Sequence, residues 1–251
     1  MTAPRRLGFA FWSFILFMLG LTVLFAWLGI WQLERLAEKD ALVAEVDRQL
    51  TQPPYELPPA GQWDAIDLET YAYHPLTLIG TYRNDDAVIV FTNLSEPNGQ
   101  YGGPGYWVMT PFEARGGGIV FVNRGFIPQD FQEAAVTDGE GDDSQVTISG
   151  LLRPAEATGF MTPEPNMSDR IEWVRDPARL AKMVDPAMAP FAPFYVDLPA
   201  GPPGELPQGG ETVVEFPNNH LGYAYTWFGF AIVAVVMLGF WLARQRAAGK
   251  G

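Results

Sequence analysis

The residues of this chain best suited to chemistry are its two histidines, His74 and His220. His220 lies where an acidic region gives way to an apolar run with no Asp, Glu, Lys or Arg before Arg244. An imidazole at a membrane boundary is a candidate functional residue. A charged imidazole without a partner is costly in apolar surroundings, so the ring is expected to be neutral, paired or bound to a metal. His74 precedes Pro75 without any metal-ligand or nucleophile–base spacing around it, so we interpret it as a half-buried or surface histidine.

Aromatic residues accompany His220 on the helix that is expected to follow it. Tyr223, Ala224 and Trp227 come three, four and seven residues later and are expected to share its face. On an antiparallel first helix, three residues reach a similar depth: Trp27, Trp31 and Gln32. The two helices are therefore expected to form an aromatic-walled slot that suits a large flat cofactor. The alternative is an ordinary anchoring belt of Trp and Tyr, with His220 capping the helix or binding a lipid headgroup.

Two apolar stretches must position these residues. Residues 7–33 and 216–243 lack Asp, Glu, Lys and Arg, and each exceeds the roughly 20 residues that cross a bilayer core. The first could be a secretory signal, but its length and the absence of a small-residue cleavage site favour an uncleaved signal anchor. Bases flank both stretches on their terminal sides, so the positive-inside rule predicts that both termini are cytoplasmic.

These boundaries predict a multi-pass membrane protein whose main domain lies on the outer side, which is the periplasm for a bacterial inner membrane and the intermembrane space for a mitochondrion. Its parts are a cytoplasmic tail (1–6), a transmembrane helix (7–33), a helical stalk (34–52), a periplasmic β-rich domain (53–215), a second transmembrane helix (216–243) and a cytoplasmic tail (244–251). All 29 acidic residues lie between Glu34 and Glu215, which argues against a nucleic-acid partner. The absence of cysteine excludes disulfides, thiolate metal sites and covalent haem attachment through Cys-x-x-Cys-His.

The region between the spans is expected to change from helix to strand. The first helix continues to about Gln49, and Pro53 and Pro54 follow it. Seven runs rich in Val, Ile, Tyr, Phe and Thr predict strands, at residues 76–82, 87–92, 106–111, 119–126, 145–152, 171–175 and 194–198. A short helix is predicted at Pro177–Val184 with Asp176 as its N-cap. Residues 137–143 and 199–210 are expected to be surface excursions.

The predicted fold class is thus a membrane protein in which two transmembrane helices bracket one mainly antiparallel β (α+β) extramembrane domain, a single sheet or small barrel. Acidic residues are numerous, but none is spaced for acid–base work, and Gly116-Gly-Gly118 lacks the helix and the Lys-Ser/Thr of a phosphate loop. We therefore predict that the protein is not an enzyme.

Short motifs occur in order along the chain. The first is Gly29-x-Trp31-Gln32-x-x-Arg35-x-x-x-Lys39. Four lie in the β-rich region, namely Gly80-Thr-Tyr82, Gly105-Tyr-Trp-Val-Met-Thr-Pro111, Val122-Asn-Arg124-Gly125-Phe126-Ile-Pro128 and Gly150-Leu-Leu-Arg153. The last is Asn218-x-His220-Leu221-x-Tyr223-x-x-Thr226-Trp227. In content and order these motifs resemble the surfeit locus family of cytochrome c oxidase assembly factors. The chain departs from the family pattern at Glu38 and Phe126, where tryptophan is usual.

The resemblance implies a non-enzymatic factor that binds haem a transiently and helps to insert it into subunit I of a haem-copper cytochrome c oxidase. His220 matches the family's second-helix histidine and is the implied axial ligand of the haem iron. The implied partners are subunit I, haem a synthase and membrane lipid.

Further contacts follow from this implied role. Tyr223, Trp227 and Trp31 are expected to pack against the porphyrin. The candidates for binding a haem propionate are Arg35, Arg83, Arg124 and Arg153, because a guanidinium matches a carboxylate bidentately. Arg124 is the first of these candidates, because it lies in the matched Asn-Arg-Gly motif. A structural salt bridge is the alternative role for Arg124.

Two other functions compete with haem delivery. The first is a cofactor-free membrane scaffold that docks subunit I or haem a synthase, to which the small residues Gly222, Gly229 and Gly239 of the second span are suited. The second, a ligand sensor, is disfavoured, because we expect only short tails past the two spans and therefore no cytoplasmic output module.

Overall fold

The computed structural model describes residues 8–132, 144–212 and 218–248. The predicted excursion at 137–143 lies outside these residues. The chain divides into two units, which we describe separately. The helical hairpin comprises residues up to Glu45 and from Glu215 onward, and the β domain comprises Val46–Val214.

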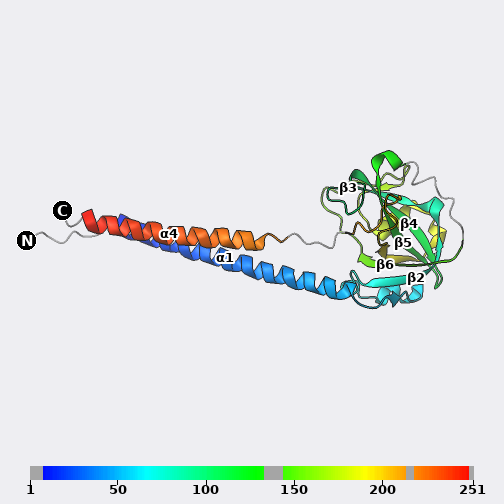
Figure 1. Ribbon diagram of the computed structural model, residues 1–251, viewed down its shortest axis with the longest axis horizontal. Helices are drawn as coiled ribbons and strands as arrows, with labels where there is room; N and C mark the ends of the chain where they lie inside the picture. The colour runs from blue at the N-terminus through cyan, green and yellow to red at the C-terminus, as the bar shows by residue number, and fades with distance from the viewer. Residues whose placement is uncertain (1–7, 133–143, 213–217, 249–251) are drawn as a thin grey trace, which may run out of the picture. The chain divides into compact units, whose positions relative to one another are not determined.

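The hairpin is built from α1 (Phe9–Leu50) and α4 (His220–Ala248), which pack side by side (Figure 1). The predicted continuation of the first helix to about Gln49 is confirmed. Only 11% of the most apolar window of each helix is buried within the protein, so these helices are not core helices of a soluble fold. Both cross a membrane, and their outer faces are apolar because lipid surrounds them. His220 is the first helical residue of α4, after the non-helical Asn218 and Asn219.

The strands of the β domain are β1 (Tyr55–Glu56), β2 (Pro75–Tyr82), β3 (Val88–Leu94), β4 (Gly103–Ala114), β5 (Ile119–Pro128), β6 (Val146–Pro154), β7 (Ile171–Glu172) and β8 (Phe191–Asp197). Six of the seven predicted strands are confirmed over most of their length, whereas the strand predicted at 171–175 is confirmed only over Ile171–Glu172. They form one sheet in the order β1-β2-β6-β8-β5-β4-β3-β7. An additional pairing of β2 with β4 closes five of the strands into a small barrel, which has no free edge along the closed strands (Figure 1).

Most strand pairs are antiparallel, as predicted, but β1 runs parallel to β2, β3 to β7, and β5 to β8. Short helices complete the domain: α3 (Pro177–Leu180) and the 3-10 turns η1 (Ala60–Ala65), η2 (Asn84–Asp86), η3 (Gln129–Phe131), η4 (Ala181–Met183) and η5 (Pro186–Met188). The side chain of Asp176 accepts a hydrogen bond from the amide of Ala178 at 2.9 Å, which confirms the predicted N-cap. Only the first turn of the predicted helix is α-helical.

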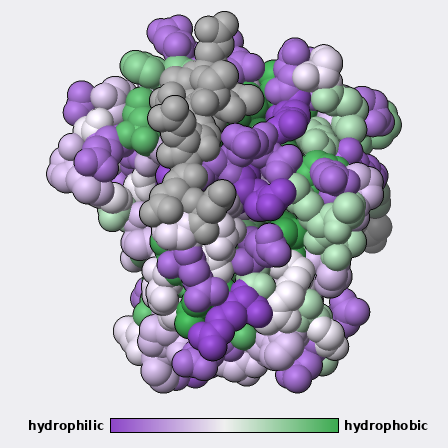
Figure 2. Space-filling model, turned by 90° about the vertical axis from the view of Figure 1, so that its right-hand side faces the viewer, coloured by the Kyte–Doolittle hydropathy of each residue, from purple (hydrophilic) through white to green (hydrophobic). Residues whose placement is uncertain are grey.

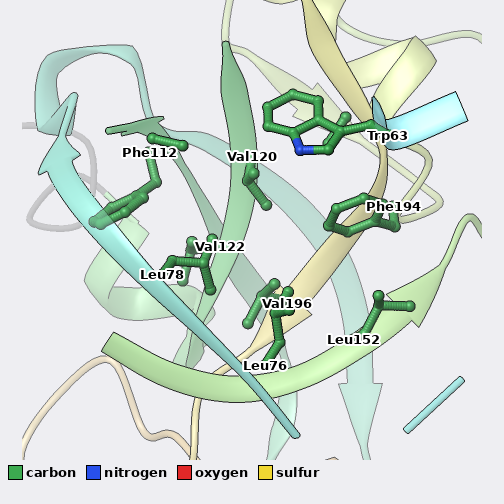
Figure 3. Close-up of a cluster of buried hydrophobic side chains, with 11 residues drawn as sticks. Trp63, Leu76, Leu78, Phe112, Val120, Val122, Leu152, Phe194 and Val196 are labelled. Atoms are coloured by element: carbon green, nitrogen blue, oxygen red, sulfur yellow. The ribbon is translucent and has the colours of Figure 1, made fainter. Parts of the chain in front are cut away.

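The core of the barrel is apolar and includes the buried Trp63 of η1. Figure 3 shows this indole and Phe194 at one side of a cluster that also includes Leu78, Val122 and Val196. The rings of Trp63 and Phe194 meet edge to face at 6.2 Å, and the indole N–H donates to the carbonyl of Pro58 at 2.8 Å. The end face of the domain in Figure 2 is mostly hydrophilic, as expected for a domain in water.

The Pro/Gly-rich segment 199–210 differs from the expected surface excursion at its C-terminal end. Gln208 is buried, and it exchanges two backbone hydrogen bonds of 2.8 Å with Phe126 of β5. Its side chain also bonds to the backbone of Tyr101. The adjacent Glu211 is buried as well and accepts from the amides of Asn98 and Gly99. The segment is therefore pinned to the barrel.

Candidate functional site

The two membrane helices meet along a seam with heptad spacing. On α4 the seam residues are alternately four and three positions apart: His220, Ala224, Trp227, Ala231, Ala234, Leu238 and Trp241. Such spacing keeps one face of a helix against an antiparallel partner, as in a coiled coil. The alanines are buried against α1, while the larger residues meet its aromatic rings. Trp241 packs on Phe14 at 4.5 Å between ring centroids, and Trp227 stacks on Phe25 at 5.9 Å.

Gly29 brings the helices close together one turn before the end of this seam. A β-carbon at this position would lie 2.6 Å from the ring of Phe228, which is closer than real contacts allow. Glycine therefore permits the ring of Phe228 to lie directly on the α1 backbone. This approach fixes the register of the two helices near His220.

His220 contacts α1 through a hydrogen bond. Its Nδ1 lies 2.7 Å from Oε1 of Gln32, whose side chain is buried in the seam. Within the described part of the chain, no side chain hydrogen-bonds to the other ring nitrogen, Nε2. The imidazole is thus oriented through one nitrogen, and the second remains available for a ligand.

The turn before α4 adds a second polar link between the helices. Asn218 donates from Nδ2 to the Asp40 carboxylate at 3.0 Å, and its Oδ1 lies 3.4 Å from the amide of His220. The start of α4 is therefore tied to α1 at two levels, by Asp40–Asn218 and by Gln32–His220.

The predicted aromatic companions of His220 divide between two faces. Ala224 and Trp227 share its seam, as predicted, whereas Tyr223 is 58% exposed on the outside of the hairpin. On α1, Trp27 and Trp31 are also exposed, and the guanidinium of Arg35 lies 5.7 Å from the Trp31 ring. Arg35 itself pairs with Glu38 at 2.6 Å. The residue that the structure brings to His220 is Gln32 rather than a tryptophan.

Three of the four arginines considered as propionate partners belong to the β domain. Arg124 on β5 donates to Asn84 at 3.1 Å and lies over the Tyr82 ring at 5.2 Å. Arg83 lies near the carboxylates of Asp86 and Glu113. Arg153 donates to the buried Asp197 at 2.8 Å. Arg35 is the member of this group that shares the hairpin with His220.

Arg153 and Arg175 form a buried ionic cluster at the end of β8. The Asp197 carboxylate accepts from Arg153, from Asn123 at 2.8 Å and from Thr212 at 2.9 Å, while Nη1 of Arg175 lies 3.8 Å away. Burial raises the pKa of the adjacent Tyr195 hydroxyl well above its ordinary value. The charges of this cluster already have partners, so we interpret it as structural.

Glu156 is the outer carboxylate of this cluster and accepts two hydrogen bonds from the Arg175 side chain. Burial raises the pKa of Glu156, but the charge and hydrogen bonds of Arg175 outweigh it and hold the pKa below its ordinary value. The pair therefore stabilises the fold at a pH above the ordinary carboxyl pKa, about 4.3. That stability is lost as the pH falls through the lowered pKa.

The β domain of a Glu156→Gln variant is accordingly expected to be less stable than wild type at pH 7 but to lose less stability on acidification from pH 5 to 3. Hydrogen exchange of β6 and β8 peptides, measured on the detergent-solubilised chain across this range, tests the difference. Glu205→Gln is the control, because Glu205 is exposed. Parallel pH curves for wild type and Glu156→Gln would contradict the expectation.

The model of the SURF1 family matches residues 19–232. The chain belongs to the SURF1 family.

Relatives in the SURF1 family come from animals, a choanoflagellate and bacteria. A SURF1-like protein of Monosiga brevicollis is 26% identical over 99% of this chain and 92% of its own length. Surfeit locus protein 1 of Homo sapiens is 27% identical over 81% of the chain and 69% of its own length. A SURF1-like protein of Rickettsia felis is 25% identical over 84% of the chain and 88% of its own length.

The SURF1 family is known for oxidase assembly factors, which agrees with the role that the motifs imply. Its matched region includes Gln32 and His220 as well as the β domain. No group of three or more His, Cys, Asp or Glu suited to a metal occurs in the residues that the structure describes. Within those residues, His220 is therefore not part of such a group.

Proposed function

We propose that this SURF1 family member binds haem a at the outward-facing interface of its membrane and helps to insert it into subunit I of a haem-copper cytochrome c oxidase. His220 is the axial ligand of the haem iron, and the partners are subunit I and, upstream of it, haem a synthase. The protein lies in the bacterial inner membrane with the β domain in the periplasm and both termini in the cytoplasm, as the flanking bases favour.

The observation that carries this proposal is the state of the His220 ring. Its Nδ1 is engaged by Gln32, and Nε2 has no hydrogen-bond partner in the described residues. A neutral imidazole held in this way is a good iron ligand. The residues present thus fit the donor that a haem requires.

The surroundings of His220 fit a haem with a lipid tail. Tyr223, Trp27 and Trp31 expose aromatic surface on the outside of the hairpin, and such faces pack against a porphyrin. When bound, haem would supply the iron centre that His220 holds. A single histidine ligand leaves that iron exchangeable, as delivery to another protein requires. Arg35 is the hairpin's candidate for a propionate.

Purification from a host that makes haem a tests the proposal. Wild type is expected to retain haem a, whereas His220→Ala should bind it roughly tenfold or more weakly, which corresponds to about 1.4 kcal/mol or more. The measurement is the absorption spectrum and the haem-to-protein ratio. His74→Ala is the matched control, because it removes the other histidine, whose Nδ1 donates to the carbonyl of Pro75 in the β domain. Equal haem content in wild type and His220→Ala would overturn the assignment.

A cofactor-free scaffold remains the second candidate, and one observation favours it. A β-carbon added to Gly222, Gly229 or Gly239 would meet no atom within 4 Å. These three glycines of α4 therefore leave room outside the hairpin for another helix to approach closely. Absence of haem from both wild type and His220→Ala, together with co-purification of subunit I or haem a synthase, would favour the scaffold.

A further inference from the structure

Gln32 is a polar residue in an otherwise apolar helix seam. Only 9% of the surface of Gln32 is exposed. The neighbouring contacts of the seam are apolar and involve Gly29, Phe25 and Trp227. Burying an amide without a partner costs free energy, so a glutamine at this position requires a hydrogen bond. Its partner is the imidazole of His220.

With the Gln32 amide in the orientation of this structure, the hydrogen bond selects one tautomer of a neutral His220. The Gln32 atom that lies 2.7 Å from Nδ1 is Oε1, and an amide oxygen can only accept. Nδ1 therefore carries the proton and donates it. In a neutral imidazole, the lone pair is then on Nε2. The bond also restricts rotation of the ring, because α1 supplies the acceptor and α4 the donor.

We propose that Gln32 is a positioning residue that holds His220 in the Nδ1–H tautomer and presents Nε2 as the ligand atom. This inference rests on the proposed haem function. An acceptor on the far nitrogen of a ligating histidine orients the ring and raises its basicity. A neutral amide does so more weakly than a carboxylate would, and this moderate donor strength suits a factor that must release its haem.

The tautomer can be measured in the haem-free protein. The chain contains two histidines, so nitrogen-15 labelling of histidine in the detergent-solubilised full chain gives two sets of ring signals, and His74→Gln leaves those of His220 alone. In wild type, Nδ1 of His220 is expected to be protonated. In Gln32→Leu the ring should shift toward the Nε2–H tautomer, whereas Gln245→Leu, at an exposed position of α4, should leave it unchanged. An Nε2–H tautomer in wild type would overturn the proposal.

Haem binding provides the second measurement. Loss of such an outer hydrogen bond typically weakens metal binding about 10–100-fold, and Gln32→Leu should weaken haem a binding by this factor. Gln32→Glu retains an acceptor, so it should bind haem and give a more negative midpoint potential, because a carboxylate makes the imidazole a stronger donor. This variant also tests the proposal if Gln32→Leu fails to fold.

The outcomes separate the two proposals. If His220→Ala abolishes haem binding but Gln32→Leu and Gln32→Glu match wild type in affinity and potential, the role of Gln32 is wrong and the haem function stands. If His220→Ala retains haem, the ligand assignment itself fails. The tautomer measured without haem still decides whether Gln32 sets the state of the ring.

Discussion

Replacing Asp197 by alanine is expected to destabilise the β domain by about 3–5 kcal/mol, the range for breaking a buried ion pair by removing one partner. Asp197 is 1% exposed, and the side chain of Arg153 is 13% exposed. Removal of the carboxylate leaves the Arg153 guanidinium buried without its counter-charge. It also leaves the Asn123 amide and the Thr212 hydroxyl without an acceptor that each now uses.

Urea unfolding of the detergent-solubilised chain, monitored by hydrogen exchange of β5, β6 and β8 peptides, measures this loss of stability. Asp64→Ala is the matched control, because Asp64 is exposed in η1, and it should change the stability by less than about 0.5 kcal/mol. The double variant Asp197→Leu/Arg153→Met should recover part of the loss, since apolar replacement of a buried pair removes both charges. A loss below 1 kcal/mol in Asp197→Ala would show that water reaches the cluster.

The strands of the β domain could be predicted because their signals are local. Alternating β-branched and aromatic residues between Gly and Asn/Asp clusters indicate each of the seven predicted strands. β1 has no such signal, because Tyr55 and Glu56 belong to a run of only three residues between two pairs of prolines. Their strand conformation comes from pairing with β2. The parallel pairing of β5 with β8 is equally a product of the tertiary fold.

The candidate site could be predicted in part. The apolar spans and the position of His220 follow from hydropathy, and the seam of α4 is visible as heptad spacing. The same spacing distinguishes Ala224, which is buried, from Tyr223, which faces outward. The partner of His220 depends on the axial register of two helices far apart in sequence. The membrane depth expected from sequence position left Trp27, Trp31 and Gln32 as candidate partners of His220. The close approach of the two helices at Gly29 decides among these candidates.

Gly80 shows how one residue permits a long-range feature that local signals cannot reveal. It pairs with Val146 of β6 and with Ala114 of β4, at the point where β2 joins the two strands to close the barrel. A β-carbon on Gly80 would lie 2.1 Å from the carbonyl oxygen of Glu113 and 2.6 Å from the Phe112 ring. The oxygen belongs to the backbone of β4, so it cannot move away without separating the strands.

Gly80→Ala is therefore expected to destabilise the β domain by about 3 kcal/mol, the upper part of the range for overpacking, because relief requires the β2–β4 pairing to open. Gly61→Ala is the matched control: a β-carbon there meets no atom within 4 Å, and the change should stay within about 0.5 kcal/mol. Hydrogen exchange should locate the damage in the Gly80–Tyr82 and Phe112–Ala114 segments, while the β3–β4 ladder stays protected. Uniform loss of protection would instead mean that barrel closure and the rest of the sheet form one cooperative unit, and unchanged protection would mean that the two strands can separate at Gly80 without cost.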